Sequence, residues 1–164
     1  MRTTLLFTTL LAIAACQPQS EDRATQTNLA AVRAEIEGVR KAWMEAAERD
    51  DAAALAQLYA DDGVVLDPVD YVPLEGRAAI RKVLAEELPV VGQLQLRSQD
   101  SYASGDLAYD YGEFTEQVTP PDEKPIMISG HYLIILRLQE DGAWKLAKKI
   151  AVMSPRQLAP GSAE

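Results

Sequence analysis

Among the residues that could do chemistry, Asp67 has the most unusual position. It lies between Leu66 and Pro68, at the end of the apolar run Val64-Val65-Leu66. A carboxylate in an apolar pocket has a raised pKa and abstracts protons better, so one interpretation is a catalytic base at the mouth of a pocket. A second is a cap on the turn at Pro68, because Asp-Pro commonly opens turns, and a third is a surface loop. The residues themselves leave all three open.

The remaining chemical groups exclude several kinds of site. Cys16 is the only cysteine and His131 the only histidine, which argues against an intrachain disulfide, a cysteine-rich zinc site and a Ser/His/Asp triad. The sequence holds no glycine-rich phosphate loop and no nucleophile elbow. Its formal net charge of −9 disfavours nucleic-acid binding, because phosphate repels an acidic domain whatever the base sequence. We therefore expect no cofactor, no bound metal and no nucleic-acid partner, and only a purely carboxylate metal site is left open.

The N-terminal residues have the pattern of a bacterial lipoprotein signal. Arg2 is followed by an apolar run that is too short to span a bilayer, so residues 1–15 are predicted to be a signal peptide. The run ends in Leu-Ala-Ile-Ala-Ala-Cys, which resembles the lipobox and predicts lipidation of Cys16. Residues 16–28 are polar and are predicted to form a flexible tether. Gln17 stands where an inner-membrane retention signal usually has Asp, so we expect a lipid anchor on the periplasmic face of the outer membrane.

Hydrophobic periodicity predicts the elements that must position these side chains. Apolar residues spaced three and four apart predict a helix over residues 29–49, and Asp51 can cap a second short helix. A short strand is expected at 64–66 and a third helix over 76–88. The period then changes to two, which predicts four long strands, at about 90–104, 107–119, 126–139 and 144–153. The order predicts an α+β domain with helices on one face of a curved antiparallel sheet, followed by a disordered tail over 155–164.

Two stretches carry a family resemblance. "ERDDAAALAQLYADDGVVLDPVDYVPLEGRAAIRKVL" resembles the nuclear transport factor 2-like superfamily, and more narrowly its SnoaL-like and ketosteroid-isomerase-like branch. "GHYLIILRLQEDGAWKLAKKI" resembles the final hairpin of that branch. The resemblance covers about residues 30–154, and the predicted domain spans 29–154. It implies a cone-shaped curved antiparallel sheet with three N-terminal helices on its concave face, a cystatin-like α+β barrel, whose cone encloses an apolar pocket.

The resemblance also implies roles for particular residues. Asp67 falls on the position of the base in ketosteroid isomerases, and the family register turns Glu113 inward as a second carboxylate. The two could act as acid and base, or pair across the cone. In that branch a Tyr and a protonated Asp hold the enolate, but their positions here carry Trp43 and Gly130. Steroid isomerisation is therefore not the expected activity.

Strand alternation and aromatic content indicate which side chains could meet a ligand. Over residues 126–139 the even positions are apolar and should line the cone, which leaves His131 on the outer face. Lys148 and Lys149, late in the last strand, are expected on a solvated edge. Five aromatic residues are candidate ligand contacts, with core packing as the alternative: Trp43, Tyr59, Tyr71, Tyr111 and Tyr132.

Three functions follow as hypotheses. The first is binding of a small apolar or amphipathic molecule in the cone. The second is a cofactor-free enzyme of isomerase, hydrolase, lyase or cyclase type, with Asp67 as general base and Glu113 assisting. The third is a homodimeric scaffold or assembly module of the cell envelope, which would use the outer sheet face around Leu133 and Ile135.

Overall fold

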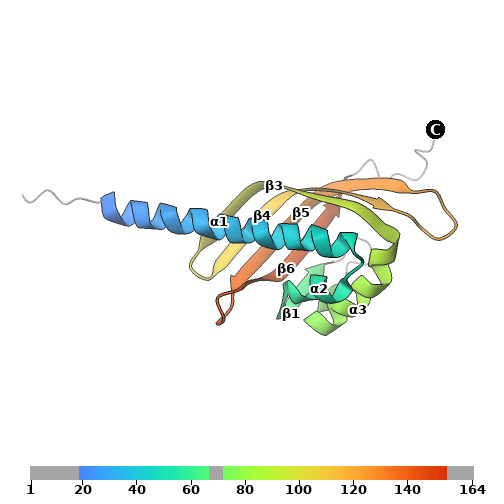
Figure 1. Ribbon diagram of the computed structural model, residues 1–164, viewed down its shortest axis with the longest axis horizontal. Helices are drawn as coiled ribbons and strands as arrows, with labels where there is room; N and C mark the ends of the chain where they lie inside the picture. The colour runs from blue at the N-terminus through green and yellow to red at the C-terminus, as the bar shows by residue number, and fades with distance from the viewer. Residues whose placement is uncertain (1–18, 67–71, 155–164) are drawn as a thin grey trace, which may run out of the picture.

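The computed structural model describes residues 19–66 and 72–154. Within these ranges two helices come first along the chain, two strands precede the third helix, and four long strands follow (Figure 1). The helices are α1 (Gln19–Glu48), α2 (Ala52–Gln57), α3 (Arg77–Glu87) and the short 3-10 helix η1 (Leu88–Val90). The strands are β1 (Tyr59–Leu66), β2 (Pro73–Glu75), β3 (Val91–Ser104), β4 (Leu107–Val118), β5 (Ile126–Leu138) and β6 (Trp144–Met153).

The strands form one curved sheet in the order β2-β1-β6-β5-β4-β3. The last four strands are joined antiparallel in chain order, and β1 lies parallel to β6. Among the described residues β2 and β3 are the two edges and do not pair, so the sheet stays open. Helix α1 runs across the sheet, and α2 and α3 pack together at one end of it (Figure 1). The predicted α+β class, with a curved sheet and N-terminal helices, is confirmed.

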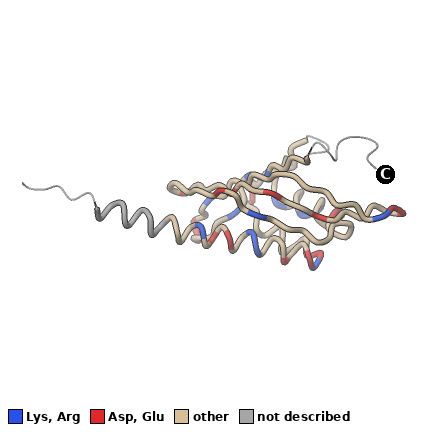
Figure 2. Tube along the Cα trace, turned by 90° about the horizontal axis from the view of Figure 1, so that it is seen from above, with Lys and Arg blue, Asp and Glu red and all other residues tan. Residues whose placement is uncertain are grey.

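Helix α1 carries the apolar stripe that its spacing predicts. Ile36 and Trp43 are buried, and Val32 and Val39 pack against the same core. Acidic and basic residues are interspersed along its later turns (Figure 2). The helix begins at Gln19, ten residues before the predicted start at residue 29. No glycine or proline interrupts the chain between Gln19 and Gly38, and nothing local stops the helix from extending there.

Short polar contacts fix the other two helices. The Asp51 side chain accepts a hydrogen bond from the Ala54 backbone N–H at 2.8 Å, which confirms the predicted N-cap of α2. Arg77, the first residue of α3, donates from Nε to the Tyr59 carbonyl at 2.9 Å and pairs with Asp61 at 2.8 Å. Both partners belong to β1, so α3 is tied to the strand that ends at Leu66.

The alternation of β5 is confirmed. Tyr132, Ile134 and Leu136 are buried on the inner face, whereas His131 is exposed on the outer face. Gly130 allows a close approach between β5 and β6, because a Cβ at this position would lie 2.1 Å from the carbonyl oxygen of Val152.

The predicted facing of β4 is wrong. Glu113 and Tyr111 were expected inside the cone, but both lie exposed on the outer face. The physical reason is the register with β5, which pairs Glu113 with His131. Directly paired residues on neighbouring strands share a face of the sheet. The even-numbered residues of β5 are apolar and face the interior, so the even-numbered residues of β4 that pair with them face the interior too. Asp110 and Phe114 are buried there instead.

Candidate functional site

A cavity of about 360 Å³ lies between the helices and the concave face of the sheet. Its volume is in the range of pockets that take small-molecule ligands. The walls come from α1, α2, α3, η1 and from β3 to β6, and most of the lining side chains are apolar, such as Leu84, Leu96, Phe114, Ile128 and Met153. The arrangement can therefore exclude water from the apolar part of a bound molecule.

Trp43 and Lys149 form one wall of the cavity. Both line it, and the Lys149 Nζ lies 4.9 Å from the centroid of the Trp43 ring, within the range of a cation–π contact. Trp43 also packs edge-to-face on Tyr59, with ring centroids 6.2 Å apart. Lys149 was expected on a solvated edge, but it is partly buried and faces the interior, because β6 is flanked by β1 and β5 and is not an edge strand.

Glu116 is a cavity carboxylate that sequence reasoning missed. It lies on the inner face of β4, three residues beyond Glu113, and lines the cavity together with Glu87 and Lys149. Burial raises the pKa of Glu116 above its ordinary value, and the positive charge of Lys149 opposes that rise. The signal that could have found it was the pairing of β4 with the apolar positions of β5, which places Glu116 opposite Ile128.

Glutamine in place of Glu116 should make the protein gain stability relative to wild type as the pH rises. A carboxyl whose pKa is raised by folding binds more protons in the native than in the unfolded state. The contribution of Glu116 to the free energy of unfolding is therefore most favourable at a pH below its pKa in the unfolded state. This contribution is lost as the pH rises through its raised pKa in the folded state. Urea unfolding of both proteins at about pH 4 and about pH 7 measures the difference. If the difference in free energy of unfolding between Glu116→Gln and the wild type is the same at both pH values, the burial of this carboxyl is contradicted.

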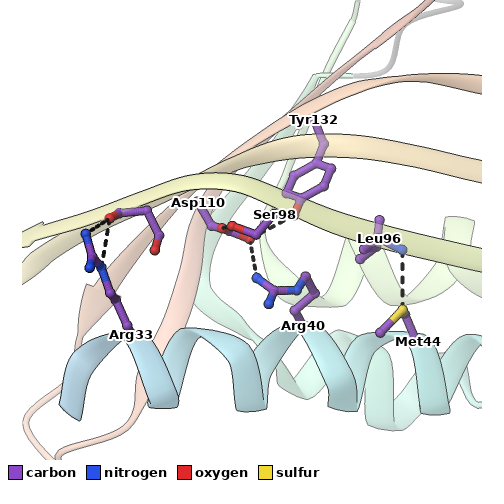
Figure 3. A network of polar contacts seen from close by, with 8 residues as sticks. Arg33, Arg40, Met44, Leu96, Ser98, Asp110 and Tyr132 are labelled. Carbon is purple, nitrogen blue, oxygen red and sulfur yellow. Dashed lines mark hydrogen bonds and ion pairs between the residues drawn. The ribbon is translucent and has the colours of Figure 1, made fainter. Parts of the chain in front are cut away.

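A buried polar network lies beside the cavity (Figure 3). Asp110 is 0% exposed and accepts hydrogen bonds from the Arg40 guanidinium at 3.0 Å, the Tyr132 hydroxyl at 2.9 Å and the Ser98 hydroxyl. Burial and the Asp110 carboxylate raise the pKa of Tyr132. Tyr132 lines the cavity, but its hydroxyl already donates to Asp110, so the network holds the ring in place. The network also ties α1 to the sheet, because Arg40 belongs to α1 and Asp110 to β4.

The sequence-predicted site residues separate into three groups. Trp43 and Tyr132 line the cavity, whereas Tyr59 is buried in the core beside Trp43. Glu113 and Tyr111 lie on the outer face of the sheet. There the Tyr111 ring stacks on the His131 ring, with ring centroids 5.7 Å apart. Asp67, Tyr71 and Cys16 lie outside the described residues. Ligand contact by Trp43 and Tyr132 stays a prediction.

Two further findings concern metals and membranes. In residues 19–66 and 72–154, no three His, Cys, Asp or Glu side chains are grouped so that they could hold a metal ion. Of the helices in that part of the chain, none has the length and apolar character needed to cross a bilayer.

Solved structures with the same architecture come from several bacteria. A ketosteroid isomerase-like protein from Erwinia carotovora atroseptica is 24% identical, with a TM-score of 0.66 over 74% of this chain and 96% of that one. An NTF2-like protein with a cystatin-like fold from Novosphingobium aromaticivorans is 18% identical, with a TM-score of 0.68 over 85% and 93%. A putative dehydratase of the NTF2-like family from Streptomyces avermitilis is 20% identical, with a TM-score of 0.59 over 74% and 95%. At these identities the similarity establishes the fold alone.

The family follows from the sequence match. The model of the SnoaL-like domain matches residues 39–147, from the middle of α1 to β6, and the chain belongs to this family. A comparison with curated proteins finds no match.

Proposed function

We propose that this protein binds a small apolar or amphipathic molecule in the cavity of its cone. The observation that carries the proposal is the 360 Å³ cavity, whose walls are apolar except for a few polar groups. Apolar walls with a small number of placed polar side chains are the usual composition of a ligand site, since the walls supply affinity and the polar groups orient the ligand.

A cavity-filling variant tests this function. In the wild type, a ligand from a panel of sterols, terpenoids and polyketide-like aromatics should raise the melting temperature of the full-length protein. About 100 Kd of ligand stabilises the folded state by roughly 2.7 kcal/mol. Ala151→Leu places a larger side chain in the cavity and should abolish the rise. Val152→Leu is the matched control, because Val152 is 60% exposed on the opposite face of the same strand.

The control also gives the contradicting outcome. A rise that persists in Ala151→Leu and is lost in Val152→Leu would place the ligand on the outer face of the sheet. No rise with any compound of the panel would remove the support for binding and favour a role of the outer face.

A cofactor-free enzyme is the second candidate, and Glu116 favours it. A carboxyl with a raised pKa inside an apolar cavity is suited to proton transfer. Asp67 remains the other candidate base on the strength of the family resemblance. Exchange of the α-hydrogens of a cyclic ketone such as 2-decalone in D₂O, followed by NMR, tests both residues. Loss of exchange in Glu116→Gln or in Asp67→Asn would identify the base, whereas no exchange by the wild type would exclude this activity for that ketone class.

The location and assembly of the protein belong to the same proposal. The lipobox-like sequence before Cys16 supports a lipid-anchored protein of the cell envelope. The outer sheet face supports a homodimer, because Tyr102, Tyr111 and Val152 expose 49%, 37% and 60% of their surface there. Sedimentation of the wild type and of Leu133→Glu tests the dimer, which should dissociate in the variant.

A further inference from the structure

The cavity has an unbalanced set of charged side chains. Among its described lining residues, Glu87 of α3 and Glu116 of β4 are acidic and Lys149 of β6 is basic. Two negative charges and one positive charge leave a net charge of −1 in the cavity, and the whole chain carries −9. In a partly water-excluded site such charges act on a ligand more strongly than they do in water.

The one cation of this lining set already has neighbours that hold it. The Lys149 ammonium lies over the Trp43 ring at 4.9 Å, and its charge acts on Glu116. An anionic head group that accepts a hydrogen bond from Lys149 would also approach the Glu116 carboxylate, whose negative charge repels it. The Tyr132 hydroxyl offers no replacement donor, because it donates to Asp110 at 2.9 Å.

An uncharged polar group is not repelled by the Glu116 carboxylate. A hydroxyl can donate to the Glu116 carboxylate and accept from Lys149, and a carbonyl can accept from Lys149 while Lys149 keeps its other contacts, since an ammonium carries three donors. Neither group adds a charge that must be removed from water. Removing a charge from water is the main cost of placing an ion in an apolar site.

We propose that the cavity selects amphipathic molecules with an uncharged hydroxyl or carbonyl end over molecules with an anionic head group, and that Glu116 enforces this selection. The inference rests on the proposed function, since it assigns the ligand class of the same cavity. Glu116 thereby becomes a specificity-determining residue.

Ligands with one chain and two head groups test the selection. N-phenyl-1-naphthylamine is a neutral apolar dye that fluoresces in apolar surroundings, and its displacement from the full-length protein reports competing ligands. 1-Decanol and decane-1-sulfonate share their alkyl chain, and the sulfonate stays anionic at every working pH. The wild type should bind decanol at least about tenfold more tightly than the sulfonate, the size expected for one like charge under partial solvent screening.

Two variants of one strand identify the responsible residue. Glu116→Gln should tighten the sulfonate by about tenfold and change decanol by less than about twofold, because only the anion senses the lost charge. Glu113→Gln makes the same change of charge on the outer face of β4 and should alter neither affinity. Melting curves of both variants verify that they are folded.

The outcomes separate this inference from the proposed function. If the dye and decanol bind the wild type but the sulfonate binds as tightly as decanol, the selection is wrong and cavity binding stands. Equal effects of Glu116→Gln and Glu113→Gln would also overturn the role of Glu116, since they would show only the effect of overall charge. If the folded wild type binds neither dye nor decanol, the proposed function fails and the selection fails with it.

Discussion

Replacing Asp110 with alanine is expected to lower the free energy of unfolding by about 3 kcal/mol. The substitution removes a fully buried carboxylate and leaves the Arg40 guanidinium and the Tyr132 hydroxyl without their acceptor. Breaking a buried ion pair on one side is costly because the remaining charge stays desolvated. We place the loss at the lower end of the usual range, because 16% of the Arg40 side chain is exposed and retains contact with water. Urea unfolding followed by circular dichroism measures it.

Glu113→Ala on the same strand is the matched control. Glu113 is exposed and accepts one hydrogen bond from Gln99 on the surface, so its loss should change stability by no more than about 0.5 kcal/mol. Equal losses for Asp110 and Glu113 would contradict the assignment of Asp110 to the inner face and Glu113 to the outer face.

Replacing Gly130 with alanine is also expected to lower the free energy of unfolding by about 3 kcal/mol. The cause is a steric conflict and not a loss of contacts. The alanine Cβ would lie 2.1 Å from the Val152 carbonyl oxygen and 2.7 Å from the Phe114 ring. The Val152 carbonyl oxygen belongs to the backbone, so relief of the conflict requires β5 and β6 to separate. The melting temperature and the urea midpoint of the variant should fall together.

Gly38→Ala provides the opposite expectation for the same chemical change. A Cβ at this position of α1 has no neighbour within 4 Å. Alanine is favoured over glycine in a helix interior by about 1 kcal/mol, so this variant should be more stable than the wild type. A Gly130→Ala protein as stable as the wild type would show that the strands do not approach as closely as described.

Where local patterns were strong, the sequence predicted the structure well. The stripe that includes Ile36 and Trp43 defined the buried face of α1, and Asp51 preceded α2 as its N-cap. Residues 126–139 alternate so clearly that both the inner face of β5 and the exposure of His131 could be derived. Each of these signals lies within one element and needs no knowledge of its neighbours.

The candidate site was harder because it depends on pairing between distant strands. Both faces of β4 carry aromatic and acidic side chains, so composition does not distinguish Glu113 from Glu116. Only the register with β5 decides, and it places Asp110 and Glu116 inside. A charged residue on the inner face also contradicts the alternation rule locally, although Arg40 from the distant α1 satisfies Asp110.

Methyl NMR of the methionines tests the central claim, ligand binding in the cone, most directly. Met153 lines the cavity, whereas Met127 is 53% exposed on the outer face of β5. On titration with N-phenyl-1-naphthylamine, the Met153 methyl signal should shift and saturate, because an aromatic ring bound in the cavity changes its surroundings, and the Met127 signal should stay in place. Saturation at Met127 with no change at Met153 would contradict the account and would assign binding to the outer face of the sheet.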